Sequence, residues 1–169
     1  FETDTPELLS MTLSGNYVYL VAATDSYSSL RVINISNPIS PTVMGSIVND
    51  PDLVFPSKIT ISGNYAYIST LGGQFVVVNI SNPALPSIVG IIDDISIFDS
   101  PFDIEISGNY AFVASDDSNS VVVVNISDPS SPEVVKIVTG PVPLINSPRQ
   151  ISISGNYAYV TLIGSNPGI

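Results

Sequence analysis

Two acidic residues, Asp103 and Glu105, lie two positions apart in a segment predicted to be a β-strand and could form a catalytic pair. They alternate with Ile104 and Ile106, and side chains two residues apart on a β-strand point to the same face of the sheet. Two carboxyl groups on one face are what acid–base hydrolysis of a glycosidic bond requires. We favour the simpler interpretation of an acidic pair facing solvent, because the repeats described below do not preserve it.

A second group of oxygen-bearing side chains, at residues 116–119, has a composition that suits calcium. It lacks the Asp-x-Asp-x-Asp-Gly spacing of calcium loops, and Asp-Asp-Ser-Asn is also an ordinary polar hairpin turn. We therefore predict a turn here and apply the same interpretation to Asp93, Asp94 and Asp99. The sequence predicts no metal site, no cofactor and no catalytic residue.

Three asparagines, Asn34, Asn79 and Asn125, each begin an Asn-Ile-Ser sequon, which is the acceptor sequence for N-glycosylation. In a secreted protein each of them could carry a glycan. The alternative is that each Asn side chain caps the turn that follows it, since Asn readily accepts a hydrogen bond from the backbone two residues on. The sequence alone leaves both interpretations open.

The residue types that are missing exclude several classes of function. With no His and no Cys in 169 residues, the chain cannot form a Ser-His-Asp triad, a thiol nucleophile or a thiolate metal site. Four basic residues stand against 15 acidic ones, for a formal net charge of −11, so nucleic acids and anionic membranes are poor partners. No apolar run approaches the roughly 20 residues of a membrane helix, and no membrane insertion is predicted.

The chain contains a tandem repeat. Ser-Gly-Asn-Tyr occurs at residues 14–17, 62–65, 107–110 and 154–157, at spacings of 48, 45 and 47 residues. The three sequons keep the same phase, with spacings of 45 and 46 residues, and each is followed by Asn-Pro or Asp-Pro. Two sequence landmarks in phase indicate a repeated structural unit.

Each unit is predicted to form four short antiparallel strands and no helix. Polar and apolar residues alternate before Ser-Gly-Asn, as in a half-buried strand, and Gly-Asn suits the hairpin turn because both residues tolerate a positive φ. Four strands repeated at this period are typical of β-propeller blades. We predict an all-β single repeat domain over residues 1–169, with blades at about 8–50, 56–95, 102–140 and 148–169.

Tyrosines recur in the second strand of every unit and could stack on sugar rings. Core positions repeat from unit to unit, whereas binding sites usually do not. We therefore assign this row to packing between blades; it comprises Tyr17, Tyr19, Tyr65, Tyr67, Tyr110, Tyr157 and Tyr159.

The segments FVVVNISNP (75–83), RVINISNP (31–38) and VVVVNISDP (121–129) resemble the signature strand and turn of the LVIVD-repeat family of bacterial and archaeal proteins. The likeness extends over almost the whole chain. It departs where Asn34, Asn79 and Asn125 stand in place of the family's usual Asp. AYVTLIGSN (158–166) is more loosely similar to YVTN-type repeats. Both families are propellers, often on cell surfaces, so the resemblance implies an extracellular or cell-surface setting.

The repeat count has a consequence for partners. A period near 46 divides 169 residues into about 3.7 units, and the fourth unit stops after its second strand. We expect either that further blades of the same polypeptide complete a larger propeller, or that self-association with another copy supplies the missing strands and gives a filament. The first expectation is favoured. The start at Phe1 without Met or signal peptide predicts a processed form or an excerpt.

These observations predict an extracellular structural or interaction repeat module that is not an enzyme and has covalent glycans as candidate partners. The first alternative is a propeller that binds a carbohydrate or another ligand in its channel. The second is a lactonase- or hydrolase-like propeller, which the absence of His and Cys disfavours. A site of either kind should break the repeat at one blade, and only Asp103 and Glu105 do so.

Overall fold

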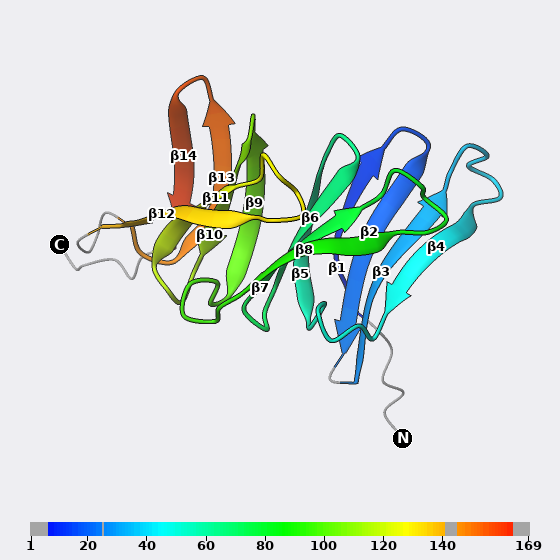
Figure 1. The fold of residues 1–169 in the computed structure, drawn as a ribbon, viewed down its shortest axis with the longest axis horizontal. Helices are drawn as coiled ribbons and strands as arrows, with labels where there is room; N and C mark the ends of the chain where they lie inside the picture. The colour runs from blue at the N-terminus through cyan, green and yellow to red at the C-terminus, as the bar shows by residue number, and fades with distance from the viewer. Residues whose placement is uncertain (1–6, 25, 141–144, 164–169) are drawn as a thin grey trace.

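The computed structural model describes residues 7–24, 26–140 and 145–163, and they form an all-β array of sheets (Figure 1). The predicted fold class is confirmed. Blades 1 to 3 are four-stranded sheets and blade 4 is a hairpin. Blade 1 consists of β1 (Glu7–Ser14), β2 (Tyr17–Thr24), β3 (Tyr27–Asn34) and β4 (Thr42–Val48), and blade 2 of β5 (Pro56–Ser62), β6 (Tyr65–Thr70), β7 (Gln74–Asn79) and β8 (Ser87–Asp93). Blade 3 consists of β9 (Pro101–Ser107), β10 (Tyr110–Ser115), β11 (Ser120–Asn125) and β12 (Glu133–Thr139). Blade 4 consists of β13 (Pro148–Ser154) and β14 (Tyr157–Leu162).

Within each blade the strands follow one another in chain order, and every neighbouring pair is antiparallel. The end of the fourth predicted blade, residues 164–169, lies outside the described residues. None of the described residues belongs to a helix of the length and hydrophobicity that a membrane crossing requires.

The Ser-Gly-Asn-Tyr motif joins the first and second strands of every blade, as predicted. Ser14 pairs directly with Tyr17, so the turn consists of two residues. Of the two residues that tolerate a positive φ, only the glycine adopts one: Gly15 has a φ of 56°, whereas none of the Asn residues at this turn is among those with a positive φ. Glycine at the first central position is typical of a type II′ turn, in which the second residue needs no left-handed conformation.

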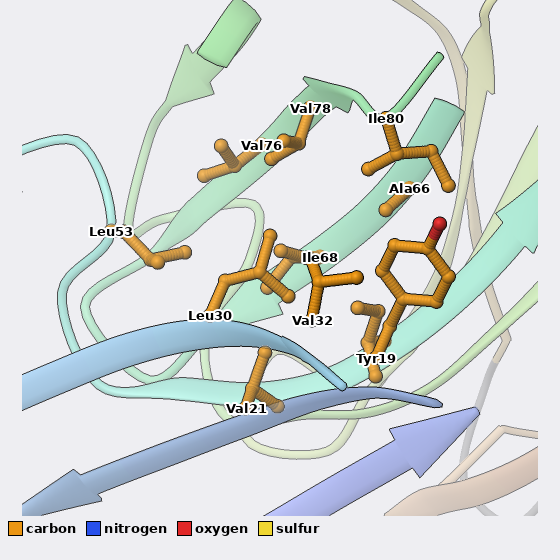
Figure 2. Packing of buried hydrophobic residues seen from close by; sticks show 11 residues of the cluster. Tyr19, Val21, Leu30, Val32, Leu53, Ala66, Ile68, Val76, Val78 and Ile80 are labelled. Carbon is orange, nitrogen blue, oxygen red and sulfur yellow. The ribbon is translucent and has the colours of Figure 1, made fainter. Parts of the chain in front are cut away.

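Successive blades are packed face against face, with their first strands β1, β5, β9 and β13 lying side by side (Figure 1). We call the face of a blade that looks toward the preceding blade its upstream face, and the opposite one its downstream face. Figure 2 shows the first contact, in which Tyr19, Val21, Leu30 and Val32 of blade 1 meet the upstream face of blade 2. A second cluster joins blades 2 and 3 and includes stacked rings of Phe75 and Phe98, with centroids 5.9 Å apart.

At the outer strands the blades meet through glycine and proline. A Cβ on Gly45 of β4 would lie 2.5 Å from the carbonyl oxygen of Pro83 in blade 2, and one on Gly90 of β8 would lie 2.3 Å from that of Pro129 in blade 3. Contacts that short do not occur, so only glycine permits this approach. The equivalent residue of β12 is the exposed Lys136.

We predict that Gly90→Ala lowers the free energy of unfolding by about 1–3 kcal/mol, because the new methyl group overpacks the contact between blades 2 and 3. Urea unfolding followed by circular dichroism measures this. The matched control is Lys136→Ala at the equivalent position of blade 3, where a change within about 0.5 kcal/mol is expected. Equal effects of the two variants would contradict the proposed contact.

Candidate interaction faces

The acidic pair of β9 does not form a free carboxylate site. Asp103 Oδ1 lies 3.0 Å from Lys58 Nζ on β5, and Oδ2 accepts a hydrogen bond from the backbone N–H of Ile151 on β13 at 3.0 Å. The Asp103 side chain is only 15% exposed, while that of Glu105 is half-buried. The interpretation of a solvent-facing pair was therefore wrong for Asp103, which joins blades 2, 3 and 4 at their first strands.

The position of Asp103 carries an interblade contact in blade 1 as well. Ser10, the equivalent residue of β1, accepts a hydrogen bond from the N–H of Ile59 on β5 at 3.4 Å. Each such side chain reaches from the downstream face of one first strand to the backbone of the next. Gln150 occupies this position in blade 4 and is exposed.

Residues 116–119 form the hairpin turn between β10 and β11, and they serve the junction with blade 4. Asp116 is 7% exposed and bonds Arg149 at 2.7 Å, and the Arg149 guanidinium lies 3.7 Å above the centre of the Phe102 ring. The Asn119 side chain accepts the N–H of Ser147 at 3.0 Å. The described residues contain no group of three or more carboxylates that could hold a metal ion.

The sequon asparagines all cap turns. The side-chain oxygens of Asn34, Asn79 and Asn125 accept the N–H of the residue two positions on, at 2.8, 2.9 and 3.0 Å respectively. The three residues end β3, β7 and β11 and are half-buried. This confirms the capping interpretation. It is compatible with a glycan, because the cap uses the side-chain oxygen and a glycan is attached to the side-chain nitrogen.

Part of the tyrosine row belongs to the core. Tyr19 and Tyr67 are each 3% exposed, and burial raises the pKa of both phenols above its usual value, with a smaller effect from the neighbouring tyrosine. The core assignment was wrong for Tyr110, Tyr157 and Tyr159, which are 44%, 71% and 61% exposed. The face of blade 3 that carries Tyr110 is followed only by the β13–β14 hairpin. No described sheet follows blade 4, which carries Tyr157 and Tyr159.

The upstream face of blade 1 is also exposed, and its exposed side chains are apolar. Met11 and Leu13 on β1 are 64% and 67% exposed, although their equivalents in blades 2 to 4 are isoleucines that are buried or half-buried. The same face has a shallow hollow of about 400 Å³, with a lining that runs from β1 to β4: Leu8, Leu20, Ala22, Tyr27, Ser29, Arg31, Ile33 and Val43. The exposed apolar side chains make this face a candidate interaction surface.

Comparison with known proteins decides the family. The model of the LVIVD repeat matches residues 9–49, 57–94, 101–140 and 147–164. The chain belongs to the LVIVD repeat family. None of the curated proteins matches it.

Solved structures share the fold of this LVIVD chain at low sequence identity. A functionally unknown protein from Desulfotomaculum acetoxidans is 18% identical, with a TM-score of 0.72 over 92% of this chain and 49% of its own. A protein from Lactobacillus plantarum is 16% identical, with a TM-score of 0.75 over 90% and 48%. The chain thus spans about half the length of these two natural proteins. The computationally designed Ika4 protein is 13% identical, with a TM-score of 0.68 over 96% and 95%.

These LVIVD blades form a module of the β-propeller type, and the structural neighbours are β-propeller proteins. Sequence reasoning missed the Gly45–Pro83 and Gly90–Pro129 contacts. The signal was present, because both glycines and both prolines recur in phase with the repeat. It also missed the contact of Arg149 with Asp116, which joins residues 33 positions apart at positions that do not repeat.

We predict that Arg149→Met lowers the free energy of unfolding by about 1–3 kcal/mol, because it leaves the largely buried Asp116 carboxylate without its partner. Lys58→Met is the matched control. Its ion pair with Asp103 is more exposed, and a loss of about 0–1 kcal/mol is expected. Urea titrations of both variants measure the difference, and a larger loss for Lys58→Met would contradict this account.

Proposed function

We propose that this chain is a structural and interaction module of the cell surface or extracellular space, which binds further blades of the same type through its two end faces. The end faces are the upstream face of blade 1 and the downstream face of blade 4. The observation that carries the proposal is the exposure of Met11 and Leu13, because the equivalent side chains of blades 2 to 4 are covered by the preceding blade. Such blades can come from the same polypeptide or from another copy.

A structural rather than catalytic role is supported by the polar residues, because their side chains bind neighbouring blades. Asp103, the residue that breaks the repeat most clearly, is engaged by Lys58 and by the backbone of Ile151. Asp116 is engaged by Arg149. These groups hold neighbouring blades in a fixed relation, so the module presents rigid faces, and rigid faces bind with a smaller loss of conformational entropy.

The extracellular setting is supported by composition. Only 11% of the residues are charged, and polarity comes mainly from Ser, Asn, Thr and Tyr. The three sequons would place glycans along the turns between third and fourth strands, where they would shield a surface with few charges from aggregation.

The proposal predicts that the chain self-associates in a concentration-dependent manner through its exposed end faces. Replacing Met11 and Leu13 by Lys should weaken this association by at least about tenfold, because it places two charges in an apolar contact. Sedimentation velocity over a range of protein concentrations measures the effect. Leu85→Lys is the control, since Leu85 is 74% exposed but lies in the outer turn of blade 2. A wild-type monomer at all concentrations would contradict binding to another copy and leave further blades of the same polypeptide as the partner.

For the glycans, we predict that expression through a eukaryotic secretory pathway gives an intact mass above the 17.8 kDa of the polypeptide. Single Asn→Gln substitutions at positions 34, 79 and 125 should each remove one glycan, because each destroys one sequon. Intact-mass spectrometry reads both results. A mass equal to that of the polypeptide would refute glycosylation and leave the end-face proposal untouched.

A further inference from the structure

We propose that a hollow between blades 1 and 2 binds a single sugar ring. The hollow has a volume of about 300 Å³ and lies where the end of β2 and the start of β3 meet the linker between β4 and β5, at one edge of the array (Figure 1). We call it the linker hollow, and its lining includes Tyr27, Ser28, Asn49, Asp50, Val54 and Phe55. The inference goes beyond the proposed function, because it concerns a small ligand and an internal junction of the array. Only Tyr27 also borders the hollow on the upstream face of blade 1.

The linker hollow is open because blade 1 lacks a contact that closes the same place in blade 2. The linker after β4 and the linker after β8 have the same length. In blade 2, Gly73 has a φ of 85°, and a Cβ built on it would lie 2.5 Å from the Cα of Ile95, so the linker sits directly on the hairpin. Blade 1 has Ser28 and Asp50 at these two positions. The Ser28 side chain keeps the linker at a greater distance, and Asp50 does not fill the space with apolar atoms.

Two aromatic side chains line the linker hollow at positions that carry small residues elsewhere. The equivalents of Tyr27 are Gly72 and Ser118, and both equivalents of Phe55 are serines. Phe55 has a φ of 51°, a left-handed conformation that is unfavourable for a bulky residue, and it is 36% exposed. Packing does not explain an exposed aromatic ring in such a conformation. Backbone strain of this kind clusters at binding sites.

The lining offers both kinds of contact that a sugar ring makes. Aromatic rings stack on the apolar C–H face of a sugar, and amide and carboxylate groups bond its hydroxyls. The Asn49 side-chain oxygen accepts the N–H of Ser28 at 3.0 Å, which leaves the side-chain NH₂ group to donate. One carboxylate oxygen of Asp50 accepts the N–H of Asp52 at 3.0 Å, and the other can accept a sugar hydroxyl.

The residues around the linker hollow are fixed without a ligand. On the linker side, Gln74 of β7 accepts the N–H of Val54 at 3.0 Å, and Leu53 is fully buried in the core shared by blades 1 and 2. On the hairpin side, the Tyr27 hydroxyl accepts a hydrogen bond from Arg31 at 2.7 Å. A site that is already ordered loses less conformational entropy on binding.

The charges favour a neutral sugar over an ion. Among the described lining residues only Asp50 is charged, and the chain has a net charge of −11, so an anion is repelled. A cation would be attracted by Asp50 but would lie near the Arg31 guanidinium, which is 5.9 Å from the centre of the Tyr27 ring. A neutral ring meets neither repulsion.

An NMR titration tests the inference on ¹⁵N-labelled protein from bacterial cytoplasm, in which the sequons carry no glycan. The probes are the methyl glycosides of glucose, galactose, mannose and N-acetylglucosamine. We expect at least one of them to shift the amide signals of residues 27–28 and 49–55. The expected Kd is on the order of 1–10 mM, as for one ring in an open site.

Variants separate the linker hollow from other surfaces. Phe55→Ser should weaken binding about fivefold, because it removes a stacking surface and introduces the residue found at this position before blades 3 and 4. The control is Tyr110→Ser on β10, since Tyr110 is 44% exposed and lies outside the hollow; unchanged affinity is expected. Ser28→Gly combined with Asp50→Ile copies the closed junction of blade 2 and should abolish binding. Circular dichroism verifies that the variants fold.

Each outcome decides the inference. The absence of shifts with every glycoside at about 50 mM, or shifts centred on other residues, would overturn it. Unchanged affinity in Phe55→Ser or in the double variant would do the same. Tetramethylammonium is the probe for a cation site, and tighter binding of this ion than of every glycoside would also overturn the inference. Sedimentation reads self-association separately, so a failure here leaves the proposed function untouched.

Discussion

The structure depends on the packing of the downstream face of each blade on the upstream face of the next. A four-stranded sheet of about 40 residues cannot bury both of its faces, and in repeat proteins the neighbouring unit covers what is left exposed. Val76, Val77 and Val78 on β7 are fully buried, because alternate side chains point into the contacts with blades 1 and 3. Stability therefore resides between the blades as much as within them.

Polar contacts fix how the blades meet. Near the first strands, Ser10, Lys58 and Asp103 each reach into the neighbouring blade, and Arg149 does so between Asp116 and the Phe102 ring. At the outer strands Gly45 and Gly90 admit the proline turns. Lys136 takes the place of glycine in blade 3. A side chain at this position would overlap a turn seated as those of blades 2 and 3 are.

The sequence predicts the architecture well because the features that recur in every repeat determine local structure. Turn residues such as Gly15 and period-two alternation act within a few residues, and the repetition multiplies a weak signal. It predicts burial less well at the ends of the array. Tyr19 and Tyr159 have the same local sequence pattern, yet they are 3% and 61% exposed, because burial depends on a neighbour that only the three-dimensional arrangement reveals. Asp103 likewise resembled a solvent-facing acid until the position of Lys58 on the preceding blade was known.

Native-state hydrogen exchange, resolved by strand, measures the central claim most directly. If packing between blades determines stability, the amides of β6 and β7 in blade 2, which is covered on both faces, should exchange slowest. Those of β13 and β14 should exchange fastest, because β14 pairs with no third strand among the described residues and no described sheet covers one face of the hairpin. Equal protection in all blades, or greatest protection in blade 4, would show that each sheet is stable by itself and would contradict the account.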